Sequence, residues 1–161
     1  MRALATFVAG AGFDAFAVSD IDSGDALALA TRFALQWAYR GRQALFWTPH
    51  YEAKTCRDEY LPFNPARPFE RRASIHIEGS RDGNDLALFA TRFSDERGAR
   101  VPELRVVRNA LRKTKSAALV FADNLKENAF ADLGFERVDG TAHDLLVVTR
   151  GVRAHATCSR I

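Results

Sequence analysis

Six polar or charged residues stand at or near the ends of apolar runs in this sequence, where side chains with catalytic chemistry are often held. They are Asp20, Arg92, Asp123, Asn124, His143 and Asp144. Carboxylates at strand ends suit hard cations such as Mg²⁺, because a rigid backbone fixes their oxygen atoms and Mg²⁺ prefers oxygen ligands. The carboxylates among these residues are therefore compatible with a site for a hard cation.

Each of these residues also has a purely structural interpretation, which the sequence leaves open. Asp20 lies within the polar stretch 19–23 and is equally explained by a solvated turn or by capping of the helix that follows. The pair Asp123-Asn124 is typical of a turn after a strand. The others are compatible with ordinary surface or strand-edge positions: Arg92, His143 and Asp144.

Length and composition favour one globular domain that spans residues 1–161. Hydrophobic residues make up 47% of the chain and charged residues 27%, which is ordinary for a packed domain. The chain has no run of 18 apolar residues that would indicate a membrane helix, and its first residues lack the pattern of a secretion signal. We therefore expect a cytoplasmic protein without membrane contact. The net charge of +3 permits a nucleic-acid or phosphorylated partner.

The remaining reactive side chains give no pattern of a metal site. Cys56 and Cys158 form no CxxC pair, so we expect two free thiols, although a disulfide between them stays open. His76 lies in an alternating segment and is predicted to be a surface residue. One stripe of a predicted helix is typical of a solvated face and also of a nucleic-acid contact: Arg105, Arg108 and Arg112.

Hydrophobic periodicity predicts an alternation of helices and strands along the chain. Helices are expected at 2–11, 23–33 with Ser23 as N-cap, 103–115, and 125–133 closed by Gly134. Strands are expected at 14–18, 37–39, 43–48, 73–78, 85–93, 117–122, 144–149 and 152–157. The stretch 52–72 is predicted to be a long surface loop. Hairpins mixed with crossover helices indicate mixed sheets, stacked face to face with helices outside.

The order of these segments resembles that of the endonuclease/exonuclease/phosphatase superfamily. Segment 14–21 is similar to the family's early strand that ends in a Mg²⁺-binding acidic residue, with Asp20 where the family has Glu. Segments 86–93, 118–125 and 143–148 resemble, in turn, its Thr-His-Leu strand, its Gly-Asp-Phe-Asn segment and its closing Asp-His strand. The resemblance runs from about residue 14 to 157 and implies an α/β (α+β) fold. Two stacked mixed β-sheets flanked by helices would form a DNase I-like four-layer sandwich.

The chain departs from the family pattern at several positions. Arg92 stands where the family has His; arginine keeps a positive charge for phosphate but does not accept a hydrogen bond or titrate near neutral pH. Leu125 replaces the second Asn, and the closing pair reads His143-Asp144, the reverse of the family's order. The family's first strand would precede the predicted helix 2–11, so the fold is expected to be truncated at that strand.

The resemblance implies Mg²⁺ as cofactor, with Asp20 and Asp123 on the metal side. It implies Asp123, His143 and Asp144 as catalytic residues, and Arg92 and Asn124 as substrate-binding residues. One hypothesis is a relative of Mg²⁺-dependent phosphoesterases with reduced or absent activity. The other is a non-catalytic module of the same fold that binds an anionic ligand or a protein partner.

Two further expectations follow from the hypotheses. In the binding module, the anion would be held by Arg92 together with arginines of the long loop, namely Arg67, Arg71 and Arg72. A sheet without its first strand has an exposed edge. We expect the loop 52–72 or a second copy of the chain, in a homo-oligomer, to cover that edge.

Overall fold

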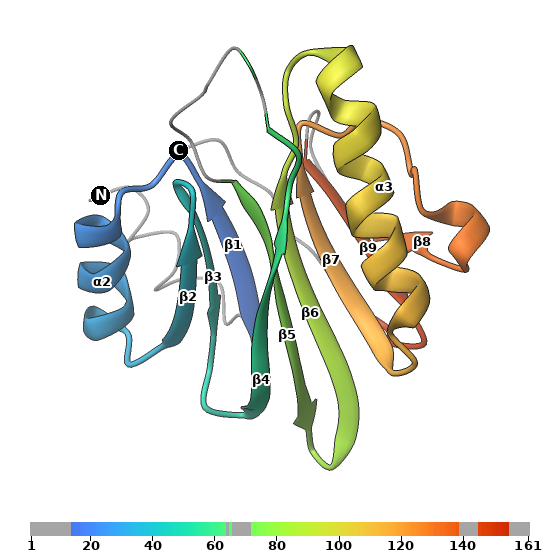
Figure 1. Cartoon of the computed structure of the whole chain (residues 1–161). Coiled ribbons are helices and arrows are strands. Elements are labelled where there is room, and N and C mark those ends of the chain that lie inside the picture. The colour runs from blue at the N-terminus through green and yellow to red at the C-terminus, as the bar shows by residue number, and fades with distance from the viewer. Residues whose placement is uncertain (1–13, 64, 66–71, 139–144, 155–161) are drawn as a thin grey trace.

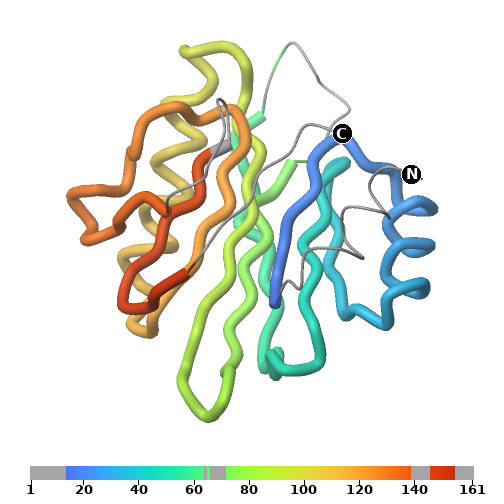
Figure 2. Tube along the Cα trace, turned by 180° about the vertical axis from the view of Figure 1, so that it is seen from behind, coloured from blue at the N-terminus to red at the C-terminus, as the bar shows by residue number. Residues whose placement is uncertain are grey.

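Two β-sheets face each other in the computed structural model, and one helix lies on the outer side of each (Figures 1 and 2). The structure describes residues 14–63, 65, 72–138 and 145–154. The resulting layers run helix, sheet, sheet, helix. The predicted α+β sandwich of two stacked sheets is therefore confirmed.

The small sheet has three antiparallel strands in the order β1-β3-β2, which are β1 (Ala15–Ser19), β2 (Gln36–Arg40) and β3 (Gln43–Trp47). The large sheet has six strands in the order β4-β5-β6-β7-β9-β8. They are β4 (Tyr51–Tyr60), β5 (Ala73–Arg81), β6 (Asn84–Arg92), β7 (Ala117–Asp123), β8 (Glu136–Arg137) and β9 (Leu145–Arg150). Helix α2 (Ser23–Arg32) covers the small sheet, helix α3 (Arg97–Lys113) covers the large one, and a short 3-10 turn, η1 (Ala131–Leu133), follows β7.

Strict alternation along the strands fills the three spaces between these layers. In β3, Phe46 packs toward α2, whereas Leu45 packs between the two sheets. In β6, Leu88 packs between the sheets, whereas Phe89 packs toward α3 and meets Val107 there. Because successive side chains of a strand point to opposite faces, an unbroken apolar strand is buried on both sides. That is why β3 reads as a continuous apolar run.

Among the described strands of the large sheet only one neighbouring pair is parallel, and it positions the candidate site. Strand β6 lies parallel to β7, with Arg92 opposite Asp123, and α3 forms the crossover between them. The other pairs are antiparallel. A parallel pair brings the carboxyl ends of both strands to the same edge of the sheet.

The predicted loop at 52–72 is wrong over its first half. Residues 51–60 form β4, a ten-residue strand that pairs with β5 through a bulge between Ala53 and Thr55. Half of its residues are charged and most of its side chains are exposed, so it lacks the apolar alternation that identifies a strand. Charges and a bulge are typical of a strand at a sheet edge. Beyond the strand, Leu61 N donates to Arg72 O at 2.9 Å, which holds these two residues side by side.

The predicted helix at 103–115 begins six residues too late, because the apolar stripe that indicates it begins only at Leu104. The helix begins at Arg97, and Pro102 lies within it. Pro102 is past the first turn, where proline is best tolerated, so the helix lacks the hydrogen bond that an N–H at this position would donate. In α2, the N-cap is Asp22 rather than Ser23, and its Oδ1 accepts from Asp25 N at 2.8 Å.

Three smaller predictions are corrected by the structure, and one short strand was not predicted. Of the predicted helix 125–133, only η1 is helical, although Gly134 does close it in a left-handed conformation at φ 79°. Residues 152–154 of the predicted last strand are not a strand, and β8 was not foreseen. His76 is buried and stacks on Phe89 with ring centroids 4.0 Å apart, so it is not a surface residue.

Three further predictions concern the cysteines, the edge of β1 and the lack of a membrane helix. Cys56 is a free, exposed thiol, whereas Cys158 and the predicted helix 2–11 lie outside the described residues. Within the described part of the chain, β1 pairs only with β3. None of the helices described there is long and apolar enough to cross a membrane.

Candidate functional site

Among the strands that end at the edge of the sheets that is uppermost in Figure 1, β1, β6 and β7 each end in or just before a predicted site residue. Asp20 directly follows β1, Arg92 ends β6 and Asp123 ends β7. Arg92 and Asp123 are opposite one another in the large sheet, whereas Asp20 belongs to the small sheet. The site therefore bridges the two sheets.

The guanidinium group of Arg92 lies between the two carboxylates. Its Nη1 is 2.6 Å from Asp20 Oδ1, and its Nε is 3.7 Å from Asp123 Oδ2. The side chains of Arg92 and Asp123 are 19% and 18% exposed, whereas that of Asp20 is 61% exposed. The structure thus brings together three of the predicted site residues, with the cationic one in the middle.

The contacts between Asp20 and Arg92 favour the charged form of each. The hydrogen bond from Arg92 lowers the pKa of Asp20, and the charges of Arg92 and Arg42 act in the same direction. Burial opposes ionisation of Arg92, but the hydrogen bond and charge of Asp20, with the charges of Asp123 and Asp95, raise the pKa of Arg92. Asp20 and Arg92 are therefore fixed charges rather than groups poised to exchange protons.

A second arginine, which the sequence analysis did not identify, also contacts Asp20. Arg42 Nε lies 3.3 Å from Asp20 Oδ1, the same oxygen that accepts from Arg92. Arg42 belongs to the turn between β2 and β3, where Gly41 and Arg42 both have positive φ values, 52° and 63°. Two such residues are typical of a tight hairpin turn. The Arg-Gly-Arg sequence signalled the turn but not its distance from Asp20.

The backbone N–H and the side-chain amide of Asn124 make hydrogen bonds within the protein rather than facing the open side of the site. Its backbone N donates to Asp123 Oδ1 at 2.9 Å, and its φ is 61°, in the left-handed region that Asn tolerates. Its side-chain Nδ2 donates to Phe93 O at 3.0 Å and to Asp95 Oδ1 at 2.9 Å. The structural interpretation of Asp123-Asn124 as a turn after a strand accounts for these contacts.

Behind the site, a buried ion pair fixes the end of β6. Arg72 Nη1 lies 2.6 Å from Glu103 Oε1 and donates to Ser94 Oγ at 2.7 Å, and its Nη2 donates to Arg92 O. Ser94 N donates to the other oxygen of Glu103 at 2.7 Å. Arg72 and Glu103 are 10% and 1% exposed, so Arg72 does not face an anionic ligand as expected. It positions the backbone of Arg92 instead.

Four residues of the predicted set cannot be placed. His143 and Asp144 lie outside the described residues, which resume at Leu145, the register partner of Asp123. Arg67 and Arg71 also lie outside the described residues. The roles predicted for them remain predictions.

The residues that the structure brings together do not fit a magnesium ion as they are arranged. Among the described residues there is no group of three or more His, Cys, Asp or Glu side chains placed to hold a metal ion. The carboxylate oxygen of Asp20 that would face a cation already accepts from two guanidinium groups. A fixed organic cation, Arg92, lies where the two carboxylates converge.

Solved structures with the same arrangement of elements were found by comparison. TDP2 from D. rerio, in a complex with a single-strand DNA product, matches with a TM-score of 0.75 at 13% identity. An endonuclease/exonuclease/phosphatase family protein from Bacteroides thetaiotaomicron matches with a TM-score of 0.70 at 13% identity. TDP2 from C. elegans matches with a TM-score of 0.66 at 14% identity. These likenesses confirm the fold implied by the sequence resemblance.

The three matches cover nearly all of this chain but not all of theirs. They cover 92%, 92% and 94% of this chain, and 75%, 73% and 59% of the D. rerio, Bacteroides and C. elegans proteins. No family model matches the sequence. No curated protein sequence matches it either. The common fold is therefore carried by the arrangement of the elements and not by sequence identity.

Proposed function

We propose that this chain belongs to the endonuclease/exonuclease/phosphatase superfamily and descends from Mg²⁺-dependent phosphoesterases, with catalytic activity that is reduced or absent. Its fold is that of the superfamily, and Asp123 and Asp20 stand at the strand ends where the resemblance places acidic residues. The observation that carries the proposal is the position of Arg92, whose Nη1 lies 2.6 Å from Asp20 Oδ1.

Charge repulsion is the physical reason for reduced activity. Two unit charges 4 Å apart interact by about 4 kcal/mol at an effective dielectric constant of 20, so a divalent ion beside a guanidinium would lose about 8 kcal/mol. The cation would also compete with Arg92 and Arg42 for Asp20. Arginine accepts no proton from water. Loss of an acid–base group costs roughly 10²- to 10⁴-fold in rate.

Hydrolysis of a generic phosphodiester tests this proposal directly. The chain and its Asp123→Asn variant would be incubated with bis(p-nitrophenyl) phosphate and either Mg²⁺ or Mn²⁺. We expect the hydrolysis rate in the presence of either protein to stay close to the rate with the metal ion alone. Metal-dependent turnover by the wild type with a kcat of about 1 s⁻¹ or more, as in ordinary enzymes, that Asp123→Asn abolishes would contradict the proposal. Turnover that is equal in both proteins would indicate a contaminating enzyme.

The alternative is a non-catalytic module that binds a phosphate-containing ligand at the same place. The observation that favours it is the convergence of two guanidinium groups on one exposed carboxylate oxygen of Asp20. Guanidinium groups bind phosphate in the same forked geometry as carboxylate, so a phosphate could displace Asp20 from Arg42 and Arg92. Inorganic phosphate would then bind Asp20→Asn more tightly than the wild type. Equal affinity in the two proteins would exclude this alternative.

A homo-oligomer that covers the free edge of β1 remains part of the proposal. Strand β1 bonds only to β3 within the described residues, and an unpaired strand edge is a template for pairing with another chain. Light scattering of the purified chain would measure its mass. A dimer is expected, and a stable monomer at high concentration would remove this part of the proposal.

A further inference from the structure

Positive charge is concentrated on one helix, away from the candidate site. Segment 97–115, which contains α3, holds seven of the 23 Lys and Arg residues of the chain but only one of its 20 acidic residues, Glu103. Its net charge is therefore +6, whereas the rest of the chain has a net charge of −3. A cluster of this kind on one helix is an electrostatic feature that binds polyanions.

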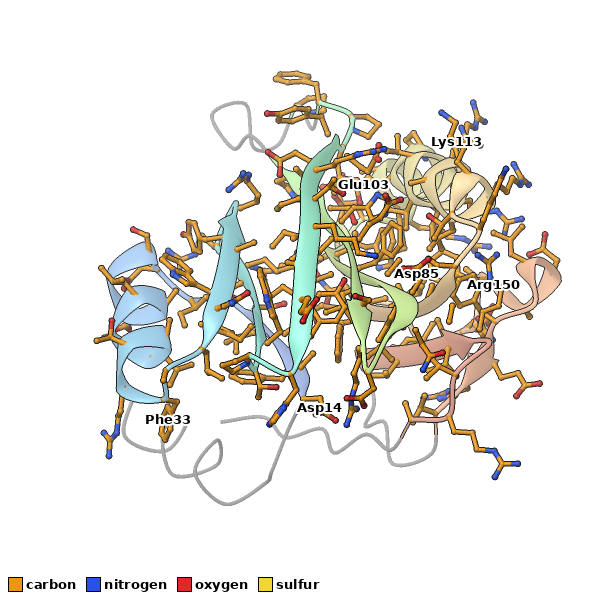
Figure 3. All side chains as sticks on the ribbon, turned by 90° about the horizontal axis from the view of Figure 1, so that it is seen from below. Asp14, Phe33, Asp85, Glu103, Lys113 and Arg150 are labelled. Carbon is orange, nitrogen blue, oxygen red and sulfur yellow. The ribbon has the colours of Figure 1, made fainter. Side chains whose placement is uncertain are left out.

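The one acidic residue of the helix does not neutralise this charge at the surface. Glu103 is buried against Arg72 on the side of α3 that faces the sheet. Figure 3 shows Glu103 on this inner side and Lys113 at the outer end of the helix. Acidic groups border the helix at both ends, since the exposed Asp95 and Glu96 precede Arg97 and Asp132 pairs with Arg108.

The cations of α3 divide into those with partners in the fold and those that face solvent. Arg108 contacts Asp132, and Arg100 donates to Ser94 O and Asp95 O. Four others on the helix are exposed, and together they form the basic α3 face: Arg97, Arg105, Arg112 and Lys113. Of these, Arg112 also donates to Asn109 Oδ1 at 3.3 Å within the helix. Since the partners of Arg100 and Arg108 hold them in place, the basic α3 face supplies the charge available to a ligand.

The spacing of this face suits an extended polyanion. Arg105 and Arg112 are seven residues apart, so they lie on nearly the same side of the helix, about 10 Å apart along its axis. From Arg97 to Lys113 these cations extend about 24 Å along the axis at a rise of 1.5 Å per residue, and Arg97 and Lys113 flank Arg105 on opposite sides, each turned by about 80° around the helix. At 3.4 Å per nucleotide step of a duplex strand, this length corresponds to roughly seven phosphates.

We propose that the basic α3 face binds the phosphate backbone of nucleic acid, without base specificity, on a surface separate from the Asp20–Arg92–Asp123 cluster. The inference does not depend on the proposed function, because it involves no residue of that cluster and no metal ion. Three of its four side chains are arginines, whose planar fork matches phosphate oxygens. The face lies on the outer surface of the large sheet, where no described element covers it.

A membrane surface is the less favoured partner. A helix that binds in a membrane interface needs large apolar side chains on the face opposite its charges, free to enter the lipid. In α3 those side chains, among them Val107 and Leu111, are buried in the core against β6 and β7. Phosphate contacts without an apolar anchor favour nucleic acid.

Binding of a fluorescein-labelled 20-base-pair DNA of mixed sequence, in EDTA, tests the inference through its salt dependence. Four phosphate contacts predict a slope of about −3.6 for log affinity against log salt, which is a loss of about 10²-fold between 50 and 200 mM salt. The variant Arg105→Gln with Arg112→Gln should lower the slope to about −1.8, which is a loss of about tenfold over the same range.

A control variant with the same change in net charge separates the basic α3 face from general electrostatics. Arg32 and Arg57 are exposed on α2 and β4, and the double variant Arg32→Gln with Arg57→Gln should keep the wild-type slope. An equal reduction of the salt slope in the two double variants would overturn the proposal. The absence of DNA binding by the wild type at 50 mM salt would also overturn it. So would binding to vesicles of 30% phosphatidylserine that exceeds binding to DNA and depends on the same arginines.

Discussion

Two arginine–carboxylate pairs lie near the end of β6, and they differ in exposure. In the pair Arg72–Glu103 both side chains are at most 10% exposed, and Ser94 adds further hydrogen bonds. In the pair Arg92–Asp20, the carboxylate is 61% exposed and a second arginine shares it. The buried pair is closed to other partners, whereas the exposed pair can exchange one. Similar chemistry therefore has a structural role in one place and a candidate binding role in the other.

The largest expected effect is a difference in unfolding free energy between variants of the two pairs. Substitution of Arg72 by Ala leaves the charge of Glu103 buried without its partner, so we expect unfolding free energy to fall by about 3–5 kcal/mol. Urea denaturation measures this change. The matched variant Arg92→Ala removes a partner of the exposed Asp20 and should cost about 1 kcal/mol or less. Similar losses in the two variants would break the comparison.

A double variant that removes both charges of the buried pair provides a second test of the same comparison. Arg72→Met together with Glu103→Leu replaces the buried pair by apolar groups of similar size, which is often close to neutral in stability. We expect the double variant to be more stable than Arg72→Ala. If it were less stable, contacts other than the charge pair would determine the stability of this region.

The smaller expected effect is in the pH dependence of stability. The pKa of Asp20 is lowered in the folded chain from its ordinary value of 3.8, so the unfolded chain takes up the proton first as pH falls. The stabilisation is complete above pH 3.8 and is lost as pH falls through the folded pKa. Because Asp20 is exposed, the effect should stay below about 1 kcal/mol.

Urea unfolding of the wild type and of Asp20→Asn between pH 2.5 and 6, a range of about 3.5 pH units around the carboxylate pKa, measures this effect. The wild type should lose more stability than the variant below pH 4, roughly the ordinary pKa of Asp. Curves that stay parallel over the whole range would show that the ion pair with Arg92 does not stabilise the fold.

Strands could be predicted from the sequence wherever the pattern of apolar residues reflects burial. Strands β3, β6 and β7 carry unbroken apolar runs because they are buried on both faces, and their order was enough to indicate the sandwich. Strand β4 could not be found in this way, since an exposed edge strand is charged and has no apolar face. The start of α3 was missed because the apolar stripe that indicates this helix, Leu104, Val107 and Leu111, begins only after Pro102.

Three residues of the candidate site were named from the sequence, but their arrangement could not be predicted. The resemblance identified Asp20, Arg92 and Asp123, each from its place at a strand end. That Arg92 lies between the carboxylates depends on how the two sheets pack, which no local pattern contains. Arg42 was missed because its contact with Asp20 is set by the pairing of β1 with β3, which are far apart in the sequence.

The central claim is that the guanidinium of Arg92 takes the place of a metal ion between Asp20 and Asp123. Binding of Mn²⁺, followed by the electron paramagnetic resonance signal of the free ion, tests it without any need for catalysis. The account predicts that Arg92→Ala binds Mn²⁺ at least about tenfold more tightly than the wild type, a change of 1.4 kcal/mol or more. Adding Asp20→Asn to that variant should abolish the gain. Equal Mn²⁺ affinity of the wild type and Arg92→Ala would contradict the account.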